Sequence, residues 1–199
     1  MTSLVECIKQ LEDDLAARPM RIAAHHDMPY AIFCYRPADE FPLRKQLRLL
    51  AITLEQSHAR RVTFISMARI AWDAVRACGG TDYLFKTETL RGFDAAQIHM
   101  NRTLSSTDLQ PASDALIRKM EGLAPDKDLV FLVRAGGFAP GIYRCSALLD
   151  NLHGHTSVPT VLFYPGSAKA GTDLQFYDLP SQDKMGVYNY RVKIYGVTS

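Results

Sequence analysis

The spacing of apolar residues predicts four amphipathic helices along the chain. They lie at residues 3–17, from about 41 to 54, from about 70 to 78 and from 111 to 120. Thr2 or Ser3 can cap the first helix, Gly79-Gly80 can end the third, and Gly122 follows the fourth. The second helix has a single apolar stripe with polar residues around it, which indicates a surface helix. The stripe consists of Leu43, Leu47, Leu50 and Leu54.

Short apolar runs alternate with these helices and predict buried strands at residues 30–35, 62–65, 129–133 and 160–164. The run at 129–133 leads through a glycine turn and an amphipathic stretch ending at Leu152 into the run at 160–164, which Pro165-Gly166 closes. Strand, helix and strand in this order form a parallel crossover unit. Binding crevices in such sheets lie beyond the carboxyl ends of the strands.

The fold class predicted for residues 1–199 is a single α/β domain, a three-layer sandwich with a mostly parallel central sheet. It is Rossmann-like, or P-loop-like without a Walker A motif. Apolar residues at 81–110 are irregularly spaced and favour helical pieces over strands. Residues 174–176 and 188–194 alternate apolar and polar positions, which predicts antiparallel strands at a sheet edge, each with one solvated face.

Composition narrows the functional classes only a little. Lys and Arg exceed Asp and Glu by two, a net charge of +2 that gives no reason to expect broad nucleic-acid binding. The four cysteines are far apart and form no Cys-x-x-Cys pair, so buried free thiols are expected. The sequence has no pattern typical of a secretory signal or a membrane span, and we expect a reducing, cytoplasmic location.

Gly136 and Gly137, with Arg144 one turn into the following helix, are the candidate ligand-binding residues. Backbone N–H groups at a glycine turn can bind an anion, and an arginine fork can hold a phosphate or carboxylate. The glycines can equally serve a tight turn, and Arg144 a surface ion pair. Neither a Walker A loop nor a dinucleotide fingerprint is present, and the loop at 166–172 has phosphate-loop residues in the wrong order.

Other candidate groups have ordinary structural explanations beside the functional ones. His25-His26-Asp27 and the pair His153 and His155 are metal-type residues, but helix capping accounts for the second group, and no metal or cofactor is expected. Asp39-Glu40 could line the crevice or provide an acidic cap for the next helix. We find no nucleophile elbow or carboxylate pair, so catalysis is not expected. A cluster of cations on one predicted helix leaves nucleic-acid binding as an alternative; it consists of Arg44, Lys45 and Arg48.

Four segments, in the same order and spacing along most of the chain, resemble the BrxB family of bacteriophage exclusion (BREX) systems. These segments are residues 29–37, 129–152, 161–166 and 188–191. The strongest parts are the glycine turn with Phe138-x-Pro140 leading through Arg144, and the Phe-Tyr-Pro-Gly closure. Where such proteins commonly carry Arg-x-His, this chain has Arg144-Cys145-Ser146.

The resemblance implies a small cytoplasmic component of a multigene anti-phage system, encoded beside a methyltransferase, a large ATPase and an alkaline-phosphatase-like protein. It implies a non-catalytic assembly or adaptor role with the phosphatase-like PglZ as the leading partner. Contact with DNA is expected only as part of a complex, and none with a membrane. Two alternatives stay open: a divergent nucleotide- or phosphate-binding protein that uses the glycine turn, and a nucleic-acid-binding subunit.

Overall fold

A computed structural model of the chain describes residues 3–22, 29–109, 111–138, 142–169, 173–179 and 192–196. Its contacts divide the chain into two compact units. Unit 1 comprises residues 1–65, 122–133 and 157–199, and unit 2 comprises residues 66–121 and 134–156.

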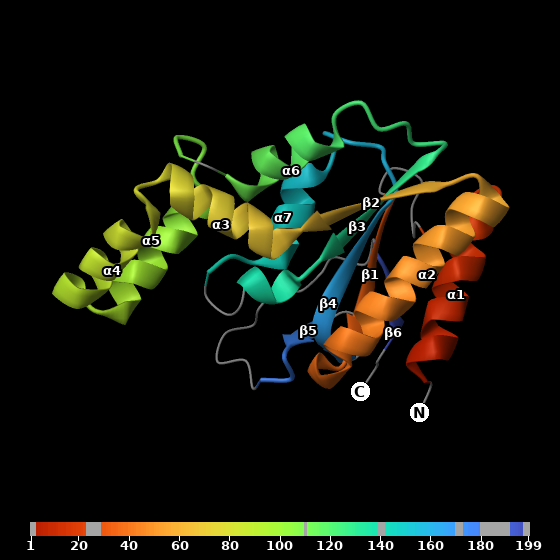
Figure 1. The fold of residues 1–199 in the computed structure, drawn as a ribbon, viewed down its shortest axis with the longest axis horizontal. Coiled ribbons are helices and arrows are strands. Elements are labelled where there is room, and N and C mark those ends of the chain that lie inside the picture. Colours follow the sequence, from red (N-terminus) through yellow and green to blue (C-terminus); the bar gives the residue numbers. More distant parts are fainter. Residues whose placement is uncertain are drawn as a thin grey trace. The chain divides into compact units, whose positions relative to one another are not determined.

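Unit 1 is built on a six-stranded sheet with the order β2-β3-β4-β1-β6 and with β5 paired to β4 (Figure 1). Its strands are β1 (Tyr30–Tyr35), β2 (Arg61–Ser66), β3 (Asp128–Val133), β4 (Thr160–Lys169), β5 (Asp173–Phe176) and β6 (Lys193–Gly196). The central pair, β1 and β4, is parallel from Tyr30 opposite Thr160 to Tyr35 opposite Pro165. All six residues of β1 are buried, because this strand lies between two others in the sheet.

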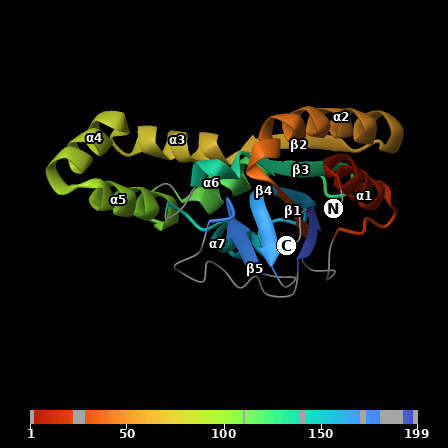
Figure 2. The ribbon, with the colours of Figure 1, turned by 90° about the horizontal axis from the view of Figure 1, so that it is seen from below.

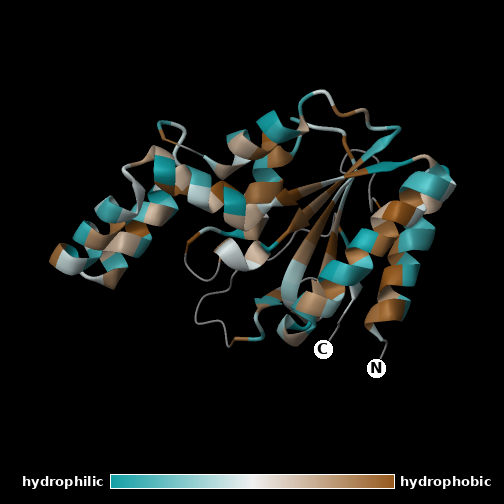
Figure 3. Cartoon of the chain, in the orientation of Figure 1, coloured by the Kyte–Doolittle hydropathy of each residue, from teal (hydrophilic) through white to brown (hydrophobic). Residues whose placement is uncertain are grey.

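Helices α1 (Leu4–Ala16) and α2 (Glu40–His58) lie side by side on one face of this sheet (Figure 2). The predicted stripe of α2 is buried at all four leucines. It packs in one apolar cluster with α1 and with the aromatic rings of the central strands. Phe163 of β4 contacts Phe33 and Phe131, with ring centroids 5.5 and 5.1 Å apart. The helix pair therefore covers the sheet as the sequence pattern requires, and the strands stand out as apolar in Figure 3.

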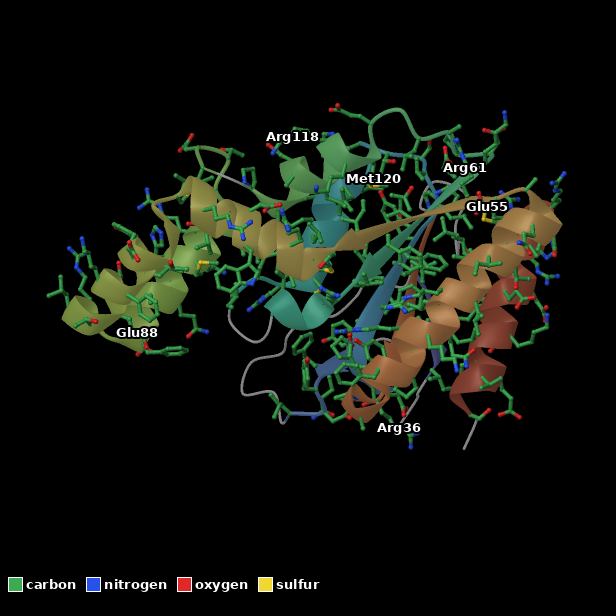
Figure 4. All side chains as sticks on the ribbon, in the orientation of Figure 1. Arg36, Glu55, Arg61, Glu88, Arg118 and Met120 are labelled. Atoms are coloured by element: carbon green, nitrogen blue, oxygen red, sulfur yellow. The ribbon has the colours of Figure 1, made fainter. Side chains whose placement is uncertain are left out.

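Two carboxylates anchor the sheet of unit 1. Asp128 accepts two hydrogen bonds from Arg61, at 2.8 and 2.9 Å, and one from the backbone N–H of Ala124 at 2.7 Å. Arg61 and Arg36 mark opposite ends of the sheet in Figure 4. Asp14 of α1 is the second anchor.

Asp14 joins the N-terminal helix to the last strand. Its carboxylate accepts hydrogen bonds from Lys193 at 2.5 Å and from the Tyr195 hydroxyl at 2.7 Å, and it pairs with Arg21 at 3.0 Å. Burial alone would raise the pKa of Asp14, but the donors Lys193 and Tyr195 and the nearby positive charge outweigh burial and lower it. This contact ties together segments that lie at opposite ends of the sequence.

Two details of the C-terminal strands differ from expectation. β5 is antiparallel to β4, as predicted. Of the other predicted strand, at 188–194, residues 188–191 lie outside the described residues. Its end belongs to β6, which pairs with β1 in parallel, from Ala31 opposite Lys193 to Cys34 opposite Gly196. Pro165-Gly166 does not end β4, which continues to Lys169 and exchanges β1 for β5 as its partner. Gly166 has φ 143°, and a Cβ there would lie 2.0 Å from the Gln175 carbonyl oxygen, so only glycine allows the exchange.

Unit 2 is helical. It contains α3 (Met67–Ala77), α4 (Gly80–Arg91), α5 (Phe93–Ser105), α6 (Ala112–Met120), the 3₁₀ turn η2 (Ala135–Phe138) and α7 (Cys145–Leu152). The helical pieces expected at 81–110 are confirmed as α4 and α5, which form a hairpin hinged at Gly92. We refer to them as the α4–α5 hairpin.

The predicted α/β class, with a mostly parallel central sheet and helices, is therefore confirmed and is consistent with a three-layer sandwich. Three of the four free cysteines, Cys7, Cys34 and Cys145, are buried, and Cys78 is half-buried. None of the helices in the described ranges combines the length and the apolarity needed to cross a membrane.

Candidate functional site

The predicted glycine turn lies in η2, at Ala135–Phe138. A Cβ atom on Gly137 would come within 2.5 Å of the Ala68 Cα and 2.7 Å of its Cβ, in the first turn of α3. Residues with a side chain cannot approach a neighbouring backbone so closely. Close packing against α3 therefore accounts for glycine at 137. A ligand-binding role for Gly136 and Gly137 stays a prediction.

Arg144 occupies a different place from the one predicted. It is the N-cap of α7, which begins at Cys145, rather than a residue one turn inside the helix. Its carbonyl oxygen accepts the Leu148 N–H at 3.2 Å, and its side chain is exposed. The helix starts late because the preceding segment is held outside helical geometry. Asn101 donates to the Ile142 carbonyl at 2.9 Å, and the Tyr143 ring packs on Phe138 at 5.5 Å.

In the part of the chain that the structure describes, which includes His153 and His155, no three metal-type side chains come together. His153 is the C-cap residue of α7, and its backbone N–H donates to the Asp150 carbonyl; capping by the imidazole stays a prediction. His155 donates its N–H to the Leu152 carbonyl. His25, His26 and Asp27 lie outside the described residues.

β1 and β4 are neighbouring parallel strands at the centre of the sheet, so their carboxyl ends lie side by side. From β1 the chain continues to β2 at one edge of the sheet, and from β4 it reaches β6 at the other edge. In open α/β sheets, ligands bind outside the carboxyl ends of the strands. We therefore take the carboxyl ends of β1 and β4 as the candidate site, and two groups of polar side chains lie there.

The first group, at the end of β1, consists of Tyr35, Glu40 and Arg44. The buried Tyr35 hydroxyl donates a hydrogen bond to the Glu40 carboxylate, and Glu40 pairs with Arg44 at 2.8 Å. Burial, followed by the hydrogen bond to Glu40 and its charge, raises the pKa of Tyr35 far above its usual value. Tyr35 is thus a neutral donor, and Glu40 can act as a base only if both partners move away.

The side chains of Asp39 and Glu40 make contacts that differ from the helix cap predicted for them. Asp39 is the N-cap residue of α2, but its side chain makes no capping hydrogen bond. It pairs with Arg36 at 2.8 Å instead. Glu40 begins the helix and turns back onto Tyr35. The 3₁₀ turn η1 (Pro37–Asp39) brings these carboxylates over the end of β1, a contact that residue spacing alone does not indicate.

The second group lies where β4 and β5 leave the sheet. Ser167 donates to the Asp178 carboxylate at 2.7 Å. Tyr177 and Asp178 both have left-handed backbone, with φ 53° and 55°, which a tyrosine adopts only under constraint. Burial, with a further contribution from the charge of Asp178, raises the pKa of the Cys34 thiol to about 12, so this thiol is protonated and unreactive.

The cations predicted as a nucleic-acid surface do not form one uniform group. Arg44 is held by Glu40 and lies 5.1 Å from the centroid of the Phe41 ring. Lys45 and Arg48 are exposed on α2. The sequence did not indicate a further group of cations, Arg118 and Lys119, which line a cleft of about 240 Å³ between α3 and α6 in unit 2 together with Asp73.

Comparison with known proteins identifies the same family as the sequence motifs. A family model described as "BREX protein BrxB" matches residues 63–194, which include strands of unit 1 and all helices of unit 2. A protein of Bacillus cereus (strain H3081.97) named "BREX protein BrxB" is 23% identical over 143 residues, covering 71% of this chain and 72% of that protein.

Proposed function

Because this chain belongs to the BrxB family, we propose that it serves its BREX anti-phage system as a non-catalytic assembly or adaptor subunit. Family membership makes the chain a BREX component, and the adaptor role is the proposal. Its partners are other BREX proteins, with PglZ as the leading candidate. It works in the cytoplasm and reaches DNA only within a complex.

The observation that carries the proposal is the surface of the α4–α5 hairpin. No residue of α4 is buried, and only Thr103 and Leu104, at the far end of α5, are buried in the second helix. Four large apolar side chains of the hairpin are each at least 66% exposed: Phe85, Leu90, Phe93 and Ile98. Apolar residues gathered on an exposed element are typical of a surface that binds another protein.

The distribution of these side chains favours a partner that encloses the hairpin. Tyr83 contacts His99 across the two helices, with ring centroids 4.8 Å apart, so this side of α4 faces α5. Phe85 is two positions further along, about 200° around the helix, and so points away from α5. A helix that is apolar on opposite sides is normally buried on both.

The polar groups at the carboxyl ends of β1 and β4 also favour a binding role over catalysis. Glu40 is committed to Tyr35 and Arg44, and Asp178 to Ser167. A general acid or base needs access to a substrate proton. Side chains already paired with one another serve better to hold the β1–α2 and β4–β5 connections in place.

An affinity pull-down tests the adaptor role. The tagged full-length chain is expressed with the other genes of its BREX system, and we expect PglZ to be recovered with it. The double change Phe85→Asp and Ile98→Asp removes apolar contacts and should reduce recovery of at least one BREX component by tenfold or more. The control is the single change Leu179→Asp, which places the same charge at an exposed apolar residue of unit 1.

Recovery of no BREX component with the wild-type chain would contradict the proposal. The nucleotide-binding alternative is tested on the same protein. It predicts a rise in melting temperature of several degrees with added nucleotide, abolished by Arg144→Ala, whereas the adaptor role predicts no shift with nucleotide and retention of PglZ by Arg144→Ala.

A further inference from the structure

Helix α2 has two apolar faces, of which the sheet uses only one. The inner face is the stripe of four leucines that packs on the sheet of unit 1. On the outside, Phe41 is 75% exposed, and Leu49 and Ile52 are 50% and 49% exposed. These three residues are separated by eight and three positions, so they lie along one side of the helix. A surface helix normally has polar residues there.

Two cations lie among these apolar side chains. Lys45 is four residues after Phe41, and Arg48 is four residues before Ile52, so all share one helix face. In the described part of the chain neither cation forms an ion pair, whereas Arg44 beside them is neutralised by Glu40. We call Phe41, Lys45, Arg48, Leu49 and Ile52 the outer face of α2.

We propose that the outer face of α2 binds an amphipathic helix of another BREX component, one in which Asp and Glu flank the apolar positions. The inference rests on the adaptor role and specifies its partner's chemistry. Apolar side chains between the cations supply the contact area, because burying them removes apolar surface from water. Lys45 and Arg48 supply selection for acidic residues. Helix α2 precedes residues 63–194, so the family match does not by itself suggest this surface.

Charge complementarity decides against the other occupants. A second copy of the chain would bring two outer faces together about a twofold axis, with Lys45 and Arg48 of each copy near their equivalents, and like charges repel. Nucleic acid would use the two cations but leave Leu49 and Ile52 without a role, because phosphate and base contacts are made by cationic, polar and aromatic groups. An acidic amphipathic helix uses all five residues.

Binding kinetics with purified PglZ of the same BREX system provide the test. Leu49→Asp with Ile52→Asp should weaken binding at least tenfold, mainly through faster dissociation, because it removes buried contacts. Lys45→Glu with Arg48→Glu should slow association and flatten its dependence on salt. Leu179→Asp and Lys127→Glu, at exposed residues elsewhere in unit 1, are matched controls that should bind like the wild type.

Carbodiimide coupling tests the acidic character of the partner directly. The reagent joins a lysine amine to a carboxylate in contact with it, and mass spectrometry then identifies the linked peptides. We expect Lys45 to be joined to an Asp or Glu within a helix of PglZ, and the joined peptide to disappear with Lys45→Arg. Circular dichroism and melting temperature of every variant confirm that the chain stays folded.

Each other result has a distinct meaning. Absence of PglZ binding by the wild type overturns the proposed partnership and the inference that rests on it. Wild-type binding that the α2 variants leave unchanged overturns the inference alone and keeps the adaptor role. Self-association lost with Leu49→Asp and Ile52→Asp would assign the face to a second copy. DNA retention lost only with Lys45→Glu and Arg48→Glu would assign it to nucleic acid.

Discussion

The chain contains two pairs of neighbouring helices, α1 with α2 and α4 with α5, which differ in how much of their apolar surface is buried. Each of α1 and α2 has one continuous apolar stripe that is buried against the sheet of unit 1. In the α4–α5 hairpin no such stripe is buried, and four large apolar side chains are exposed. The first pair is stabilised by a core and the second largely by its own local interactions. The buried stripes of the first pair thus contribute to the core of unit 1, whereas the exposed apolar residues of the second pair do not.

The largest expected difference between the pairs is in sensitivity to loss of a side chain. Leu54 in α2 is fully buried, and Leu54→Ala should lower the free energy of unfolding by about 3 kcal/mol or more. Ile98→Ala in α5 should change it by less than about 0.5 kcal/mol, because the side chain already meets water. Urea unfolding measures both. If the two variants lost a similar free energy of unfolding, the Ile98 side chain would have to be buried against another part of the molecule.

The second largest expected difference between the two helix pairs comes from the buried carboxylate of Asp14 in α1. Asp14→Asn removes a charge that accepts from Lys193 and Tyr195 and should cost about 1–3 kcal/mol at neutral pH. The pKa of Asp14 is lowered in the folded chain. Its contribution is therefore complete above the unfolded pKa of about 3.9 and is lost as the pH falls through the folded value.

Urea unfolding of wild type and Asp14→Asn at pH 6 and near pH 3 provides the measurement. We expect the two free energies of unfolding to converge at the lower pH. A difference that stayed constant would mean that Asp14 acts through packing rather than charge. The partners of Asp14 are Arg21, Lys193 and Tyr195, all in unit 1, so this acid-dependent loss belongs to α1 and not to the hairpin.

The N-terminal ends of the helices in the two pairs also differ, with a smaller expected effect on the free energy of unfolding. Ser3 accepts the Glu6 N–H at 3.2 Å and donates its own N–H to the Glu6 carboxylate at 2.7 Å, a complete capping box. Both hairpin helices begin after a glycine without a side-chain cap. Ser3→Ala should cost about 1 kcal/mol, measured by urea unfolding. Ser105→Ala in α5 is the control, because its hydroxyl only bonds the Asn101 carbonyl four residues back.

Local signals explain which parts of the fold could be predicted. The strand at 30–35 and the leucine stripe of α2 agree residue by residue with the structure, because apolar spacing reports directly which side of an element is buried. The direction of β6 could not be predicted in this way, because alternation marks a strand without naming its neighbour. Its place beside β1 requires glycine at 196, where a Cβ would lie 1.9 Å from the Cys34 carbonyl oxygen.

The candidate site was harder to predict because its contacts depend on how connections fold back. Sequence order places Asp39 and Glu40 near a crevice, but their partners are set by the turn at 37–39. Ser167 and Asp178 are eleven residues apart and meet only through the β4–β5 pairing, which Pro165-Gly166 argues against in the sequence. Gly137 stands out in the sequence as a turn residue, although only the structure shows that it contacts the backbone of α3.

Gly92 lies at the hinge of the α4–α5 hairpin, and its substitution should change global stability less than the other variants do. It also tests most directly whether the hairpin opens separately from the rest of its unit. Its φ of 87° and ψ of 168° lie in a region that glycine alone adopts easily, and no heavy atom beyond its chain neighbours lies within 4 Å of the position that a Cβ would take. Gly92→Ala should therefore strain the backbone by about 1–3 kcal/mol without any clash.

That strain should appear in local opening of the hairpin rather than in global unfolding. Helices of this length are marginal without a core, so α4 and α5 can open while the rest stays folded, and the global loss cannot exceed the small stability of the hairpin itself. Hydrogen exchange of hairpin amides should accelerate severalfold, while the urea midpoint stays almost unchanged. If the urea midpoint instead falls by an amount that corresponds to the full strain energy, the hairpin unfolds together with its unit. Its exposed apolar residues then cannot be attributed to a separately stabilised binding element.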